Sequence, residues 1–188
     1  MESPTTTNET VAPTLPSHAA RYGAIMGGIS VVITLLLYAV DYTMMAKWWV
    51  GLLMFAISIG VVIYGGINYR NQTTGYISYG KAYQHGYLTF LIGGLIGSIF
   101  SILLYTVIDP ELPEKLTDAV IENTEEMMRG FGAPEDQIET QLDKMREDMP
   151  NTFSAMGVIK QFGIGLIIYA VLTAITSLFV KKNEPEMM

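Results

Sequence analysis

The sequence has no cysteine among its 188 residues and only two histidines, His18 and His85. Without cysteine the chain can form no disulfide, thiolate metal site, cysteine nucleophile or thiol-linked lipid anchor. Two histidines leave little for a histidine-based metal site, so we expect neither a metal nor a cofactor. With 11 basic against 18 acidic residues and a net charge of -7, the chain also lacks the clustered Lys and Arg that nucleic-acid binding requires.

The short signatures of catalysis are absent as well. The sequence contains no H-E-x-x-H, G-x-S-x-G, G-x-x-x-x-G-K-[ST] or C-x-x-C. A serine or aspartate could pair with a histidine only around His85, and a polar residue at a membrane boundary explains that histidine more simply. No pair of membrane-embedded aspartates is available for an intramembrane protease. We therefore expect the chain not to be an enzyme.

Long hydrophobic runs are what the sequence does contain. Half of its residues are hydrophobic, 15% are charged and the mean hydropathy is +0.33, which is too apolar for a soluble protein. Four uncharged runs of 19, 22, 23 and 20 residues lie between Arg21 and Asp41, between Lys47 and Arg70, from Gly86 to Ile108, and between Lys160 and Lys181. As helices they would be about 28–35 Å long, which matches the hydrocarbon core of a bilayer. The sequence predicts an all-α polytopic membrane protein with four transmembrane helices.

Aromatic residues with a polar atom flank these runs. Trp48 and Trp49 open the second run, and Tyr76, Tyr79 and Tyr83 precede the third. Such side chains favour the headgroup region because the ring is apolar whereas the OH or NH needs water. We expect these five residues to be membrane-interface anchors. The segment near residues 76–85 is expected to be an amphipathic entry helix lying at the headgroups.

Composition gives the remaining boundaries. Residues 1–20 are rich in Thr, Pro and Ser and carry no basic residue, which favours a disordered polar tail over a signal peptide. Residues 21–108 then hold the first three transmembrane helices, 109–157 an extramembrane segment, 158–182 the fourth transmembrane helix, and 183–188 a short tail.

The segment 109–157 is too long for a bare loop. Its apolar residues recur at helical spacing in two stretches separated by Gly130 and Gly132, and 13 acidic residues lie between Asp109 and Asp148. This pattern predicts an acidic helical hairpin between the third and fourth transmembrane helices. Its apolar stripes can pack against each other, against the bilayer or against a partner. The candidate partner-binding residues are Leu116, Val120, Met127, Ile138, Leu142 and Met145.

Two G-x-x-x-G pairs lie within the apolar runs, Gly23 with Gly27 and Gly93 with Gly97. Helices can approach closely where no Cβ is present, so these are candidate helix-packing residues, either within the bundle or between copies. No ionisable residue lies near the middle of a run. Proton-coupled transport is therefore disfavoured, because ionisable groups are costly in a bilayer and persist there mainly to carry protons, ions or substrates.

Three short motifs resemble the bacterial family catalogued as domain of unknown function 4199: NYRN at 68–71, GYISYGKA at 75–82 and IDPE at 108–111. The Gly-rich third run and the Met-rich acidic hairpin add to the resemblance, which extends from about Ala20 to Lys182. It implies a four-helix inner-membrane protein of Bacteroidetes type. It carries no catalytic or binding residue over, because no activity is established for the family.

The basic residues beside short, acid-poor loops favour both termini in the cytoplasm and the acidic hairpin outside, in a bacterial inner membrane. We expect a non-enzymatic protein that serves as an accessory or assembly subunit of a larger membrane complex through its hairpin and Gly-rich helix faces. The alternative is a small oligomeric channel or a lipid or solute carrier. The expected partners are the lipid bilayer and a membrane protein or a second copy, but no nucleic acid.

Overall fold

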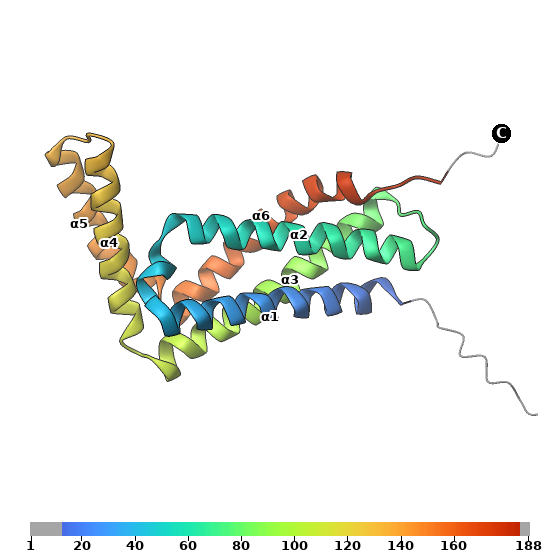
Figure 1. Ribbon diagram of the computed structural model, residues 1–188, viewed down its shortest axis with the longest axis horizontal. Helices are drawn as coiled ribbons and strands as arrows, with labels where there is room; N and C mark the ends of the chain where they lie inside the picture. Colours follow the sequence, from blue (N-terminus) through green and yellow to red (C-terminus); the bar gives the residue numbers. More distant parts are fainter. Residues whose placement is uncertain (1–12, 185–188) are drawn as a thin grey trace, which may run out of the picture.

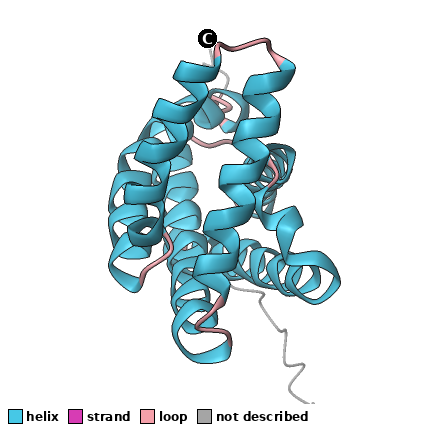
Figure 2. Ribbon diagram, turned by 90° about the vertical axis from the view of Figure 1, so that its left-hand side faces the viewer, coloured by secondary structure: helices cyan, strands magenta, loops and turns pink. Residues whose placement is uncertain are grey.

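The computed structural model describes residues 13–184. Its elements are helical: α1 (Leu15–Asp41), η1 (Tyr42–Ala46), α2 (Trp48–Gln72), α3 (Tyr79–Leu103), η2 (Leu104–Ile108), α4 (Leu112–Gly130), α5 (Glu135–Thr152) and α6 (Ala155–Val180). The short η1 is a 3-10 helix and η2 is a π-helix that extends α3. Figure 1 shows α1, α2, α3 and α6 in an elongated bundle, with α4 and α5 lying across one end of it. In Figure 2 the bundle is seen from that end.

Four helical segments are long and apolar enough to cross a membrane: Leu15–Ala46, Trp48–Gln72, Tyr79–Ile108 and Ala155–Val180. Many of their large apolar side chains face outward, among them Val32 and Leu36 on α1 and Ile167 and Val171 on α6. So much outward-facing apolar surface suits lipid and not water. The predicted all-helical fold with four membrane-length helices is therefore confirmed.

The helices of the bundle alternate in direction. Both ends of the described chain and the α2–α3 loop lie at one end of the bundle, here called the terminal end, and α4 and α5 lie at the other, the α4–α5 end (Figure 1). At the terminal end, Ile77 and Lys182 exchange two backbone hydrogen bonds of 2.9 and 3.0 Å. Arg70 donates from Nη1 to the carbonyl oxygen of Val180 over 2.8 Å. These bonds join the end of α2 and the α2–α3 loop to the end of α6.

α3 is the central helix, because its contacts with α1 and with α6 are the most extensive between any two helices. The buried apolar residues form four clusters along the long axis of the molecule. They are Ile77, Ala82 and Val180 at the terminal end; Met26, Val62 and Phe90 in the middle; Leu104, Leu112 and Leu116 where α3 meets α4; and Ile121, Ile138 and Leu142 between α4 and α5.

Two predicted boundaries need correction at the terminal end. α1 begins at Leu15 with Pro16 in its first turn, so residues 15–20 are helical and do not belong to a disordered tail. The predicted amphipathic entry helix at 76–85 is not a separate element, because α3 runs without a break from its N-cap, Ser78. Charged residues mark where the apolar runs end, whereas caps and prolines determine where a helix begins. The rest of the predicted tails, 1–12 and 185–188, lies outside the described residues.

A third boundary changes at the α4–α5 end. α5 continues through Pro150 to Thr152, and α6 begins at Ala155, three residues before the predicted start of the fourth transmembrane helix. Ser154 caps α6, because its Oγ accepts a hydrogen bond of 3.0 Å from the backbone N–H of Gly157.

Candidate functional site

The predicted packing glycines of α1 face α3. A Cβ added at Gly23 would lie 2.7 Å from the Cβ of Ile92, and one added at Gly27 would lie 2.7 Å from the Cβ of Ile96. Such distances are too short for two carbon atoms, so both positions require glycine at the observed helix separation. Gly28, next in sequence, has no neighbour within 4 Å of an added Cβ.

The glycines of α3 face α1 in return. An added Cβ at Gly93 would collide with the side chain of Met26 and lie 3.1 Å from the carbonyl oxygen of Gly23. Gly97 is less tightly packed, at 3.6 Å from Oγ of Ser30. The two G-x-x-x-G pairs therefore lie in one interface inside the chain.

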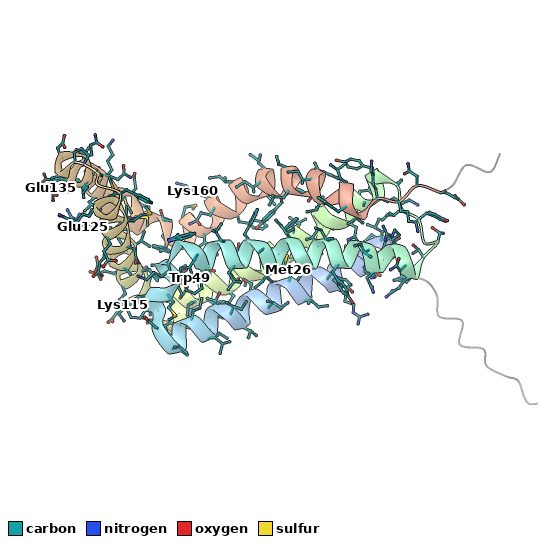
Figure 3. All side chains as sticks on the ribbon, turned by 45° about the horizontal axis from the view of Figure 1, so that its top comes forward. Met26, Trp49, Lys115, Glu125, Glu135 and Lys160 are labelled. Carbon is teal, nitrogen blue, oxygen red and sulfur yellow. The ribbon has the colours of Figure 1, made fainter. Side chains whose placement is uncertain are left out.

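The predicted interface anchors lie at both ends of the bundle. Trp48 and Trp49 begin α2 at the α4–α5 end and are exposed, and Figure 3 shows Trp49 there. The three tyrosines lie at the terminal end and make contacts of their own. Tyr79 donates from its hydroxyl to a backbone carbonyl of α6 over 3.1 Å, and Tyr83 stacks on the next tyrosine of α3. The ring of Tyr76 lies 5.3 Å from the ammonium group of a C-terminal lysine.

The apolar stripes of α4 and α5 are largely buried within the chain. Leu116 is 1% exposed and packs with Leu104 of η2, while Ile138 and Leu142 pack on Ile121. Of the other three candidate partner-binding residues, Val120 and Met145 are half-buried and Met127 is 46% exposed. Of the three alternatives, these contacts favour the first: α4 and α5 bury the stripes against each other and against the bundle, and Met127 alone of the six is exposed.

The IDPE motif forms the junction between the bundle and α4. Asp109 accepts a hydrogen bond from the hydroxyl of Tyr38 over 3.2 Å and one from the backbone N–H of Glu111 over 3.1 Å. Its carboxylate also lies 3.7 Å from Nζ of Lys115. A hydrogen bond with Glu111 raises the pKa of Lys115, as does the charge of Asp109. The motif thus fixes the end of α1 to the start of α4.

The exposed surface of α4 and α5 is acidic. Arg129 pairs with Glu125 over 3.1 Å and with Glu135 over 2.6 Å, and the hydrogen bond with Glu125 raises the pKa of Arg129. Both glutamates are visible on these helices in Figure 3. Eight further carboxylates are exposed and form no ion pair within residues 13–184. These unpaired carboxylates, here called the acidic face, belong to Glu114, Asp118, Glu122, Glu126, Asp136, Glu139, Glu147 and Asp148.

A polar cluster that was not predicted lies buried near the terminal end. Nδ1 of His18 and Nε2 of His85 are 2.9 Å apart, and Nε2 of His18 lies 3.1 Å from Oδ1 of Asn68. His18 is 4% exposed and His85 is fully buried. His85 therefore faces the interior of the bundle, a feature that its position at the edge of the third run does not reveal. Because α1 begins at Leu15, His18 is helical and reaches the level of His85 on α3.

Two tyrosines enclose this histidine pair. The ring of Tyr22 stacks on His18 with centroids 4.8 Å apart, and the ring of Tyr69 stacks on His85 with centroids 5.5 Å apart. One signal in the sequence could have revealed the cluster. His18 precedes the first run, Asn68 lies near the end of the second and His85 precedes the third, so alternating helices bring all three to the same end of the bundle.

A cleft of about 470 Å³ lies between α1, α2, α3 and α6, in the half of the bundle next to α4 and α5. Met26 and Phe90 contribute apolar walls, and Ser30, Ser98 and Ser101 contribute hydroxyls. These three serine hydroxyls form no hydrogen bond within residues 13–184. The cleft thus offers both apolar contacts and free hydrogen-bonding groups at membrane depth.

The chemistry open to these sites is limited by their residue types. Among residues 13–184, no three His, Asp or Glu side chains lie close enough together to hold a metal ion. The histidine pair can bind and release protons, the acidic face can attract cations, and the cleft can bind a molecule with apolar and hydroxyl-accepting parts.

Comparison with known protein families gives a match over most of the chain. A family model described as "Protein of unknown function (DUF4199)" matches residues 21–182, which is most of the chain. The searches of curated proteins and of solved structures found no match.

Proposed function

Because the chain belongs to the DUF4199 family of proteins of unknown function, we propose its function from its geometry: a non-enzymatic membrane protein that acts as an accessory or assembly subunit of a larger membrane complex. α4 and α5 present the acidic face to this complex. The proposal differs from the sequence-based expectation in one respect. The chain contacts its partner through charged residues, because the apolar stripes and the α1–α3 glycines already pack against other parts of the same chain.

The observation that carries the proposal is the acidic face itself. α4 and α5 share a buried cluster of Ile121, Ile138 and Leu142, so they form a packed unit. A chain that needed this segment only as a connection would not require two packed helices with eight exposed, unpaired carboxylates. A cluster of negatively charged carboxylates attracts a partner with a basic surface and speeds the encounter.

The proposed location is a bacterial inner membrane, with both termini in the cytoplasm and α4 and α5 outside. The placement of basic residues beside the short loops supports this orientation. Since the chain has no cysteine, single cysteines can report on it. A cysteine replacing Glu139 should react with a membrane-impermeant thiol reagent in whole cells, and one replacing Asn71 should react only after lysis. The reverse labelling pattern would show the opposite orientation, with α4 and α5 in the cytoplasm.

Neutralising the acidic face should weaken association with the complex. In the variant E122Q/E139Q, two carboxylates that form no ion pair within residues 13–184 lose their charge without a change in side-chain size. Each exposed charge contributes up to about 1 kcal/mol, so we expect co-purification in mild detergent to weaken by about tenfold and to become less sensitive to salt.

The matched control is N71K/Q84K, which changes the net charge by the same amount at exposed positions of the terminal end. It should leave co-purification unchanged. Equal losses in the two variants would mean that net charge matters and the acidic face does not. A wild-type chain that purifies alone from several mild detergents would contradict the proposal.

The cleft favours a second candidate function, that of a lipid carrier or lipid-binding protein. Its volume of about 470 Å³ lies in the range of small-molecule sites, about 300–1,000 Å³. Free serine hydroxyls beside Met26 and Phe90 suit an amphipathic molecule, with its chain on the apolar wall and an ester or hydroxyl group on the serines.

Filling the cleft tests this second candidate. S98F places a ring in the cleft, whereas I99F places the same ring at the next residue of α3, which is exposed. We expect S98F to bind a phosphatidylethanolamine with a fluorescent acyl chain about tenfold more weakly than the wild type, and I99F to bind it normally. Equal binding by both variants would exclude the cleft as the lipid site.

A further inference from the structure

The hydrogen bonds of the buried histidine pair determine where its protons lie. Oδ1 of Asn68 carries no proton and already accepts a hydrogen bond of 2.7 Å from Nε2 of Gln72. Nε2 of His18, at 3.1 Å from the same oxygen, must therefore be the donor. A neutral imidazole has one N–H, so Nδ1 of His18 carries a lone pair and accepts from Nε2 of His85 over 2.9 Å.

The series of hydrogen bonds that links Asn68, His18 and His85 ends at Nδ1 of His85. Since Nε2 of His85 donates to His18, Nδ1 must carry the lone pair of the neutral ring. That nitrogen is buried and has no hydrogen-bond partner among the described residues. A buried acceptor without a donor is costly, and native structures rarely retain one without a use. The series therefore holds one free, fully buried proton acceptor.

From this geometry we propose that the His18–His85 pair is a proton-binding site that takes up a single proton at Nδ1 of His85. The added proton leaves all the existing bonds in place, because Nε2 of His85 still donates to Nδ1 of His18. A second proton has no place: it would have to bind Nδ1 of His18, where it would meet the N–H of His85. The pair is thus limited to one proton while α1 and α3 remain joined.

The groups around the pair offer a positive charge two aromatic rings and nearby hydroxyl groups. The ring of Tyr22 on α1 lies within 6 Å of His18, and the ring of Tyr69 on α2 lies within 6 Å of both imidazoles, at a distance where an aromatic ring attracts a cation. α6 contributes the hydroxyl residues Thr173, Thr176 and Ser177 to the buried part of the terminal half. The basic residues nearest in sequence are Arg21 and Lys81, which are exposed, and Arg70, which bonds to Val180.

Carboxylates do not stabilise the proton at this end. Among residues 13–184, the acidic side chains outside the α4–α5 segment and its flanks are Asp41, at the opposite end of α1, and Glu184, exposed beyond α6. Without a neutralising partner, the protonated pair is a charged group held in an apolar bundle. Proton uptake therefore acts on the packing of three helices at once, since His18, Asn68 and His85 come from α1, α2 and α3.

The test is nitrogen NMR of the full chain, labelled with ¹⁵N at its histidines, in lipid bilayers over a range of pH. At neutral pH we expect both Nε2 atoms to carry protons and both Nδ1 atoms to carry none. On acidification one imidazole, that of His85, should become doubly protonated while His18 keeps a single proton. Independent titration of the two rings, a proton on Nδ1 of His85 at neutral pH, or no protonation of either ring before the chain unfolds would overturn the proposal.

Two variants of Asn68 separate the proton arrangement from simple packing. N68L removes the acceptor that fixes His18, so the two rings should show a mixture of tautomers. N68D keeps an acceptor oxygen in the same place and should preserve the single arrangement. A fixed arrangement in N68L would show that the Asn68 oxygen does not set the tautomers, and would contradict the series on which the proposal rests.

Discussion

Replacing Gly27 by alanine should lower the free energy of unfolding by about 1–3 kcal/mol. The new methyl carbon would lie 2.7 Å from Cβ and 2.8 Å from Cγ2 of Ile96. Neither atom is the end of a flexible side chain, so relief requires movement of α1 away from α3. These two helices make the most extensive contact in the bundle, so the substitution weakens its main interface. Unfolding in mixed micelles, followed by circular dichroism, measures the effect.

The adjacent residue supplies the control. Gly28 is on the same helix, but an added Cβ there meets nothing within 4 Å. G28A should be neutral or slightly stabilising, because alanine is a better helix former than glycine by about 1 kcal/mol. Similar destabilisation in G27A and G28A would mean that the α1–α3 distance is wrong. If the glycines joined two copies instead, G27A would change the oligomeric state while leaving the unfolding of the monomer intact.

Replacing Leu116 by alanine should lower the free energy of unfolding by about 2–5 kcal/mol. The side chain is 1% exposed and packs with Leu104 and Leu112 in the cluster where α3 meets α4. Removal of its three terminal carbons leaves a cavity at the junction that holds α4 and α5 to the bundle. We expect the midpoint of thermal unfolding to fall and limited proteolysis within α4 and α5 to accelerate.

Met127 is the matched control for Leu116. It lies on the same helix and was predicted as part of the same apolar stripe, but it is 46% exposed. M127A should change stability by no more than about 0.5 kcal/mol. Comparable losses for L116A and M127A would contradict the packing of α4 described above.

The sequence was sufficient to predict the helices because their signals are local. Each membrane-length helix contains a run without charge, and each such run is long enough to cross a bilayer. The G-x-x-x-G pairs were recognisable for the same reason. The sequence does not show whether these glycines pack within the bundle or between copies, because that depends on which helix lies opposite. The contacts with Ile92 and Ile96 place them within the bundle.

The histidine cluster and the cleft could not be predicted in the same way. His18 and His85 are 67 residues apart, and neither carries a local signal that it is buried. The first uncharged run begins after Arg21, so the run itself does not indicate that α1 extends back to include His18. The cleft depends on the shapes of four helices packed together, a property to which no single stretch of sequence corresponds.

The central position of α3 has a consequence for biogenesis. α1 and α2 enter the membrane first, but α1 touches α2 far less than it touches α3. Few contacts between α1 and α2 therefore stabilise this pair of helices before α3 is inserted. α6 follows only after the whole of α4 and α5 has been synthesised, and its main contact is again α3. Insertion of the third helix is accordingly the step at which a lasting bundle first becomes possible.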